Sequence, residues 1–525
     1  MSHDTSKATS SPSTTSSSPS AESEAARAAT PKLFPEYDSL DATALADLVR
    51  RGEVTSGEVL EAAIERAELR NEYLNAVVTP LYEYARERSD ALPDGPLAGV
   101  PFLLKDLKAK LAGTPTSNGN RLEKGRIAEQ NSLIVDRFLD AGVQVMGKSS
   151  SPEFGIMAVT EPEIWGPCRN PWALDRTPGG SSGGSSAAVA ARIVPIAHAG
   201  DGGGSIRIPA SATGTFGLKP TRGRVSMAPF LGEGWGGFVQ EGVISRSVRD
   251  TALCLDNIDQ LTPGEPYAAP HKERPWVSHL RAPDRALKVA YTTGTLFGSD
   301  NHPDCIAAVE SSVKLLEELG HHVEEARPSF PREELIEAYF LTVASGVAVF
   351  VEDASEYAGV KPHHKNFEAV TWALAQIGWN MSAAQLTRAR RTIHRASREV
   401  AKTFEEYDVF VTSTHAAPPV MIGELALKPA DRLQLSVIRN LPLQALFDKL
   451  LKGMGAKALE RTPNTMLFNQ TGQPAMSVPL YWSEAGLPIG TQIVGPFGGE
   501  GLLFELATQL EEARPWSGRL PPLLG

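Results

Sequence analysis

Two loops rich in glycine and serine, residues 179–186 and 200–205, flank an apolar segment at residues 187–199. The apolar segment predicts a small buried helix followed by a strand at 193–197. A flexible linker is a poor explanation for the first loop, because residues of a buried core follow it at once. We therefore expect both loops to be ordered and to lie between elements of the hydrophobic core.

Helical and extended patterns alternate along the rest of the chain. Asp41 predicts the N-cap of one helix, which ends at Gly52, and Thr55 or Ser56 predicts the start of the next. Further helices are expected at 132–140, 303–319, most of 333–405 and 502–512, and strands at 97–104, 143–146, 287–291, 323–326, 409–412, 476–480 and 490–494. This alternation predicts an α/β protein with one large mixed sheet.

The first 31 residues differ in composition from all that follow. Between Ser2 and Ser23 the residues are mostly Ser and Thr, with two prolines and almost no apolar residue. Such a segment cannot bury enough surface to offset the entropy lost on ordering, so we expect a disordered tail at 1–31. Residues 32–525 are expected to form a single domain, with a surface excursion rich in Pro and His near 262–288.

The charge balance and the cysteines limit the classes of partner. The chain has 51 basic and 62 acidic residues, a net charge of −11, which argues against nucleic acid as the main partner. Its three cysteines form no C-x-x-C pair, so neither a disulfide framework nor a zinc ribbon is expected. With no uninterrupted apolar run of about 18 residues and no signal-peptide pattern, we expect a cytoplasmic protein that does not cross a membrane.

Two short motifs suggest other functions but lack the context that those functions need. Residues 142–149 match the phosphate-loop pattern G-x-x-x-x-G-K-[ST], yet they follow a predicted helix and read as a buried strand. Residues 179–183 match G-x-S-x-G, the nucleophile elbow of α/β-hydrolases, which needs a preceding strand and a later histidine. The last histidine is His415, and the stretch before the motif is not strand-like. A Ser-His-Asp enzyme is kept as an alternative.

Lys105 and the two loops could together carry chemistry. Lys105 follows the apolar run 97–104, where burial would lower its pKa from the usual value of about 10.4 and make it a usable base. The second loop places three glycines directly before Ser205, so that backbone N–H groups can converge on one point, as an oxyanion hole requires. Taken singly, each feature also has an ordinary explanation, namely a lysine that reaches solvent and a tight turn between strands.

In this order and spacing, the features resemble those of the amidase signature family. Ser181 follows Lys105 by 76 residues, and Ser205 follows Ser181 by 24. The resemblance extends over nearly all of 35–520 and rests on these segments: GVPF at 99–102, KD at 105–106, NPW at 170–172, 178–185, 201–209, GLKP at 217–220 and GLPIGTQ at 486–492. Residues 160–166 and 197–198 are most similar to the 6-aminohexanoate cyclic-dimer hydrolases, a subfamily that opens cyclic nylon oligomers. Gly200 departs from the family, in which many members carry threonine at this position.

The resemblance implies a twisted mixed sheet covered by helices on both faces and a Ser–cis-Ser–Lys triad. In that triad Ser205 is the nucleophile, Ser181 the bridging serine and Lys105 the base. A cis peptide bond is implied between Gly180 and Ser181. The implied oxyanion hole consists of the N–H groups of Gly202, Gly203, Gly204 and Ser205, and the implied supporting residues are Ser182, Asp201 and Arg207. For Ser182 the alternative is an exposed loop hydroxyl. Neither a metal nor an organic cofactor is implied.

The implied partner is a small-molecule amide. A linear amide, a cyclic oligoamide, an aryl acylamide and a carbamate are all compatible with the sequence. The segment 230–238, rich in Gly and aromatic residues, predicts either an apolar substrate pocket or a surface loop packed on the core. Alternatives to an independent amidase are the amidase subunit of a glutamine-dependent transamidating complex and a non-catalytic binding protein. A homodimer is compatible with the sequence.

Overall fold

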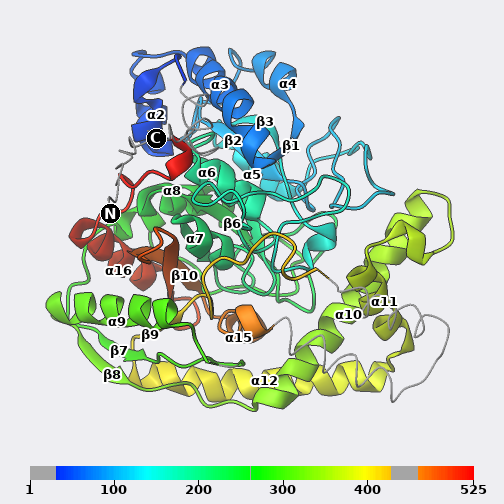
Figure 1. Ribbon diagram of the computed structural model, residues 1–525, viewed down its shortest axis with the longest axis vertical. Coiled ribbons are helices and arrows are strands. Elements are labelled where there is room, and N and C mark those ends of the chain that lie inside the picture. Colours follow the sequence, from blue (N-terminus) through cyan, green and yellow to red (C-terminus); the bar gives the residue numbers. More distant parts are fainter. Residues whose placement is uncertain (1–30, 261, 299, 427–458, 525) are drawn as a thin grey trace, which may run out of the picture.

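Eleven strands from the described residues form one mixed sheet through the centre of the computed structural model (Figure 1). The structure describes residues 31–260, 262–298, 300–426 and 459–524, so the expected tail lies outside the described residues except for Pro31. The strands are β1 (Val77–Pro80), β2 (Pro101–Lys105), β3 (Gln144–Ser149), β4 (Ile196–Asp201), β5 (Phe216–Lys219), β6 (Gln240–Ser245), β7 (Lys288–Tyr291), β8 (His322–Glu325), β9 (Val409–Ser413), β10 (Ala475–Trp482) and β11 (Pro488–Val494). Their order in the sheet is β1-β3-β2-β4-β6-β5-β10-β11-β9-β7-β8.

The sheet is antiparallel in its middle and has a parallel group on either side of that middle, with β1 added antiparallel to β3 at one edge. Strand β2 pairs in parallel with β3 and β4, and β7 pairs in parallel with β8 and β9. The pairs from β4 through β6, β5, β10 and β11 to β9 are antiparallel. The predicted α/β class with a large mixed sheet is therefore confirmed.

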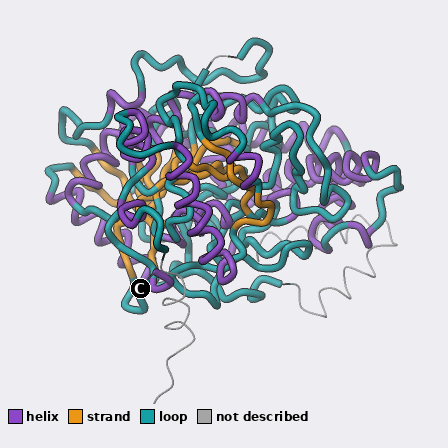
Figure 2. Tube along the Cα trace, turned by 90° about the horizontal axis from the view of Figure 1, so that it is seen from above, coloured by secondary structure: helices purple, strands orange, loops and turns teal. Residues whose placement is uncertain are grey.

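Helices cover the sheet on both sides, and in Figure 2 the strands lie inside a shell of helices and loops. The helices are α2 (Ala42–Arg50), α3 (Ser56–Leu74), α4 (Tyr82–Arg86), α5 (Leu133–Asp140), α6 (Gly183–Ala190), α7 (Arg207–Thr213), α8 (Val248–Ile258), α9 (Pro303–Glu318), α10 (Arg332–Tyr357), α11 (Ala369–Asn380), α12 (Ala383–Glu406), α15 (Met466–Thr471) and α16 (Glu500–Ala513). One large apolar cluster joins the sheet to α2, α3, α5, α6, α8 and α16, and a second joins it to α10, α11, α12 and α15.

Capping residues explain why the first helices begin where the sequence predicts. The Asp41 side chain accepts a hydrogen bond from the backbone N–H of Ala44 at the start of α2. At the start of α3, Thr55 and Glu58 form a reciprocal capping box. The predicted strand at 143–146 is also confirmed as part of β3, whose Lys148 donates inside the protein to the Thr116 hydroxyl at 2.6 Å. The phosphate-loop motif is thus a buried strand.

Other elements differ from their predictions in position or character. The strand expected at 193–197 lies later, as β4, and α6 begins at Gly183 inside the expected loop. Strands β1, β5 and β6 were not predicted. The excursion at 262–288 is largely exposed but is anchored by Trp276, which is buried against Phe504.

Helix α10 contains an apolar stretch that the sequence analysis overlooked. By length and composition alone it could cross a membrane, but half of its most apolar window is buried in the protein. It packs against α11 and α12 in the second apolar cluster (Figure 1). Burial of this kind is typical of the core helix of a globular domain.

Candidate active site

Lys105 is the last residue of β2, and its side chain is enclosed by the protein. The residue is 1% exposed, and its Nζ donates a hydrogen bond of 2.7 Å to the hydroxyl of Ser181 and a longer one of 3.4 Å to the carbonyl of Gly200. Burial lowers the pKa of Lys105 to about 8, against the opposing effect of the Glu241 and Asp201 carboxylates. A lysine with this pKa is partly neutral near neutral pH and can accept a proton.

The two loops bring Ser181 and Ser205 together. The backbone N–H of Ser181 donates to the Ser205 Oγ at 3.1 Å, and both serines are buried. The direct contact between the two residues thus runs through the backbone of Ser181, whose hydroxyl faces Lys105. The three residues that the sequence assigns to a triad meet at one place, although they come from three separate segments.

The peptide bond between Gly180 and Ser181 is trans, which corrects the expectation of a cis bond. Among the described residues, the cis peptide bond lies between Ala228 and Pro229. Gly179 and Gly180 both have positive φ, of 77° and 59°, a backbone conformation that glycine adopts without steric cost. With this backbone and a trans bond before it, the Ser181 hydroxyl lies 2.7 Å from the Lys105 Nζ.

Ser182 is a buried part of the loop framework rather than an exposed hydroxyl. It is fully buried, and its Oγ donates to the carbonyl of Gly200 at 3.2 Å while accepting from the N–H of Gly200 at 3.4 Å. The same Gly200 carbonyl accepts from Lys105. Ser182 therefore ties the first loop to the strand that leads into the second.

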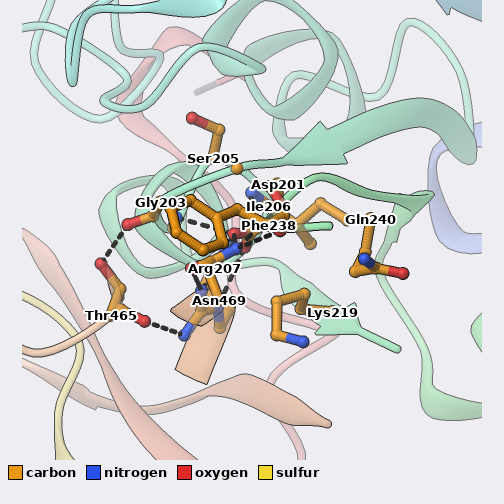
Figure 3. Close-up of polar contacts among 12 residues, drawn as sticks. Asp201, Gly203, Ser205, Ile206, Arg207, Lys219, Phe238, Gln240, Thr465 and Asn469 are labelled. Carbon is orange, nitrogen blue, oxygen red and sulfur yellow. Dashed lines mark hydrogen bonds and ion pairs between the residues drawn. The ribbon is translucent and has the colours of Figure 1, made fainter. Parts of the chain in front are cut away.

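Asp201 and Arg207 form a buried ion pair beneath the second loop (Figure 3). Both side chains are inaccessible to solvent, and two nitrogens of Arg207 each lie 2.9 Å from the Asp201 carboxylate. Although burial alone would raise it, the pKa of Asp201 is held well below its usual range by the Arg207 guanidinium. The carboxylate also accepts from the backbone N–H groups of Gly204 and Ile206. Asp201 thereby fixes the backbone on both sides of Ser205, whose side chain points away from the pair in Figure 3.

Three residues from the last part of the chain complete this support. Asn469 donates to the Asp201 carboxylate at 2.8 Å, Thr465 donates from its hydroxyl to the carbonyl of Gly203 at 2.6 Å, and Gln492 accepts from Arg207 at 2.6 Å. Sequence reasoning missed Asn469 and Thr465, because neither belongs to a motif that was singled out. Gln492 lies at the end of the GLPIGTQ segment, so this motif could have identified it as a supporting residue.

The glycines of the second loop leave backbone N–H groups that could face an oxyanion, with one exception. The N–H of Gly204 is already donated to Asp201 at 2.7 Å, so this residue does not serve as the fourth expected donor. No acceptor within the described residues holds the N–H groups of Gly202, Gly203 and Ser205. A side chain at Gly203 would lie 2.3 Å from the hydroxyl of Tyr339, so the loop also needs glycine for packing. The arrangement suits an oxyanion hole with three donors instead of four.

Lys105 and Ser181 line a cavity of about 40 Å³, which shares lining residues with a larger one of about 370 Å³. Phe154, Met227, Leu231 and Phe350 line both cavities. Of the aromatic segment 230–238, Leu231 and Trp235 line the inner cavity, whereas Phe238 is buried and stacks on Tyr339. Part of this segment thus lines an apolar cavity, as one interpretation predicts, and part packs on the core, as the other predicts. The inner cavity is small and mostly apolar beside Lys105 and Ser181.

The histidines near the loops do not form a Ser-His pair. His415 donates through its Nε2–H to the carbonyl of Ile208, and burial lowers its pKa to about 4. His198 contacts the backbone N–H of Lys105 and the carboxylate of Glu241. Since neither imidazole contacts Ser181 or Ser205, the geometry favours Lys105 over histidine as the base.

Comparisons with known proteins agree with this arrangement. The family model described as Amidase matches residues 58–504. A 6-aminohexanoate-cyclic-dimer hydrolase from Pseudomonas sp. (strain NK87) is 37% identical over 492 residues, which cover 92% of this chain and 97% of that protein. The solved structure of 6-aminohexanoate cyclic dimer hydrolase is similar with a TM-score of 0.84 and 35% identity, covering 93% of this chain and 99% of the other. A bacterial aryl acylamidase of the amidase signature family has a TM-score of 0.80 and 26% identity, covering 93% and 98%.

Proposed function

We propose that this chain, which belongs to the amidase family and hydrolyses amide bonds, forms an acyl-enzyme on Ser205 during hydrolysis. The observation that carries the proposal is the 2.7 Å hydrogen bond from the buried Lys105 Nζ to the Ser181 hydroxyl, beside Ser205 and a cavity. A neutral lysine at that distance is in place to receive a proton from Ser181.

In the first step the proton of Ser205 passes to Ser181 as the proton of Ser181 passes to Lys105. Ser205 Oγ then attacks the carbonyl carbon of the amide. The two serines are already joined at 3.1 Å through the N–H of Ser181, and catalytic hydrogen bonds often tighten only when substrate is bound. We therefore expect the two hydroxyls to draw together in the substrate complex.

The N–H groups of Gly202, Gly203 and Ser205 would hold the negative charge that forms on the carbonyl oxygen. A single donor of this kind is worth about 3 kcal/mol of transition-state stabilisation. The C–N bond breaks as the leaving nitrogen takes a proton from Ser181, which is reprotonated by Lys105. Water then hydrolyses the ester on Ser205 and restores the free hydroxyl.

The substrate that we propose is a cyclic or oligomeric amide without charge at the scissile bond. Support comes from the 37% identity to a 6-aminohexanoate-cyclic-dimer hydrolase and from the mostly apolar lining of the inner cavity. The larger cavity beyond Phe350 offers room for the remainder of such a molecule. An aryl acylamide is the second candidate, because the aryl acylamidase is also similar in structure.

Amine release by wild type and Lys105→Ala across a panel of amides tests both parts of the proposal. The panel holds the 6-aminohexanoate cyclic dimer, a linear aliphatic amide, a p-nitroanilide and an aryl carbamate. Cleavage by wild type but not by the variant supports the lysine triad, and the preferred compound identifies the substrate class. Substantial cleavage by Lys105→Ala would favour a histidine-dependent hydrolase. If wild type cleaves nothing in the panel, the alternative hypothesis that this chain is the amidase subunit of a transamidating complex gains support.

A further inference from the structure

Gly200 and Glu241 lie opposite each other in the antiparallel pair of β4 and β6. A Cβ atom at Gly200 would lie 2.6 Å from Oε2 of Glu241, so the carboxylate occupies the space that a side chain at position 200 would need. The carbonyl of the same glycine accepts a hydrogen bond from the Lys105 Nζ. The missing side chain therefore allows a carboxylate to approach the buried lysine, and both side chains line the inner cavity.

His198 holds this carboxylate in place. Its Nε2 lies 3.0 Å from Oε2 of Glu241, and its Nδ1 lies 3.3 Å from the backbone nitrogen of Lys105. Because a backbone N–H can only donate, we assign Nδ1 as the acceptor and place the imidazole proton on Nε2, facing Glu241. In this tautomer the imidazole is neutral and leaves the negative charge of Glu241 uncompensated.

We propose that Glu241 sets the pH at which Lys105 becomes a base, with His198 and Gly200 as the positioning residues that keep its carboxylate in place. The inference rests on the function proposed above, since it takes Lys105 as the base. In this role Glu241 acts on Lys105 and does not contact the substrate. Its effect on the pH dependence can therefore be measured before any substrate binds.

Two carboxylates act on Lys105, and they differ in how far they are neutralised. Asp201, at the end of β4, is paired with the Arg207 guanidinium. Glu241, from β6, contacts the His198 imidazole at 3.0 Å, and no Lys or Arg of the described residues lies within ion-pair distance of its carboxylate. Burial lowers the pKa of Lys105, and Glu241 is the larger of the two charges that oppose this. Removing the Glu241 charge should therefore let the pKa of Lys105 fall further.

Covalent labelling of Ser205 by a fluorophosphonate measures this effect without a known substrate. The Ser205 Oγ–P bond forms as fluoride leaves, and the rate depends on how much of Lys105 is neutral. In Glu241→Gln the amide oxygen still accepts from His198 while the charge is gone. We expect the midpoint of the rate against pH to move down by roughly one pH unit. The plateau at high pH should also fall, because a weaker base accepts the proton less readily.

Glu505→Gln is the matched control, because Glu505 also contacts a histidine, His279 at 2.9 Å, but lines neither cavity and is absent from the charges that act on Lys105. Its midpoint should equal that of wild type. Gly200→Ala is a second test variant, in which the new methyl group displaces the Glu241 carboxylate without removing its charge. The midpoint of Gly200→Ala should move in the same direction by a smaller amount. If Glu241→Gln does not fold, Gly200→Ala takes its place as the test of the inference.

Three results would overturn the inference in distinguishable ways. If the folded Glu241→Gln protein, or Gly200→Ala in its place, keeps the wild-type midpoint while Lys105→Ala is not labelled, Lys105 is the base and Glu241 does not set its pH range. If Lys105→Ala is labelled at the wild-type rate, the proposed function fails and the inference fails with it. A change in KM for an amide with an unchanged midpoint would make Glu241 a substrate contact and would also overturn the inference.

Discussion

The hydroxyl of Thr465 donates to the carbonyl oxygen of Gly203, a residue 262 positions earlier in the chain, at 2.6 Å. This contact places a residue next to α15 directly on the loop that presents Ser205. The shape of the loop is therefore set by its distant neighbours as much as by its own glycines.

Gly204→Ala should nearly abolish activity. Gly204 has a φ of 131°, and a Cβ there would lie 2.4 Å from the Thr465 hydroxyl oxygen, so the loop must shift. We expect at least about a 100-fold loss in kcat, the effect of losing one oxyanion donor. Gly320→Ala is the control, because its φ of 89° is equally left-handed but nothing lies within 4 Å of the new methyl group. Equal activity losses in both variants would mean that backbone strain, and not the contact with Thr465, is responsible.

Alanine at any triad position should remove catalysis and leave the fold intact. Each of Lys105→Ala, Ser181→Ala and Ser205→Ala is expected to lose at least about 1,000-fold in kcat, and double variants should lose little more, because the three residues act as one unit. Steady-state kinetics and thermal melting of the purified variants check this. Full activity in any one of the folded variants contradicts the triad.

Breaking the buried ion pair should unfold the loop region. Arg207→Met leaves the Asp201 carboxylate buried without its cation, which typically costs about 3–5 kcal/mol. Urea unfolding followed by circular dichroism measures the loss. The exposed pair of Arg50 and Asp47 supplies the control, since Asp47→Asn should change the free energy of unfolding very little. Comparable losses in the two variants would show that the buried pair has no special structural role.

The activity should rise with pH through the pKa of Lys105. The lysine must be neutral to accept a proton, and burial places its pKa at about 8. Below that value kcat/KM should fall by roughly tenfold per pH unit, and above it the rate should level off. A pH profile of wild type from 5.5 to 10 measures this directly. A flat profile between pH 6 and 8 would show that another group, or no base, controls the step.

Phe350→Ala should weaken substrate binding more than it slows the chemical step. Phe350 lines both cavities, and the Lys108 ammonium lies 3.9 Å from the centre of its ring. Removing a large apolar wall is expected to raise KM by at least about tenfold, with kcat changed much less. Phe497→Ala is the control, since Phe497 is 47% exposed and lines neither cavity. A loss confined to kcat would place Phe350 in the reaction itself.

Local signals were enough to predict much of the fold. Helix caps such as Asp41 and Thr55 act within one turn, and apolar runs such as that before Lys105 mark buried strands whatever their partners. Strands β5 and β6 escaped prediction because they are short and buried along their whole length, which leaves no alternation between polar and apolar residues.

The candidate site could be predicted as a set of residues but not as a geometry. The motifs marked Lys105, Ser181 and Ser205, while the trans bond before Ser181 and the engaged N–H of Gly204 depend on contacts that only the folded chain makes. The supporting Thr465 and Asn469 come from more than 250 residues further along, and a single polar residue in a helix carries no sign of such a partner.

The order in which the chain is made has a consequence for when it can act. Ribosomal synthesis completes Lys105, Ser181 and Ser205 more than 250 residues before Thr465 and Asn469 are made. A nascent chain therefore contains Lys105, Ser181 and Ser205 long before it contains the side chains that fix the loop before Ser205. On the proposed mechanism, hydrolytic competence has to wait until α15 has been made.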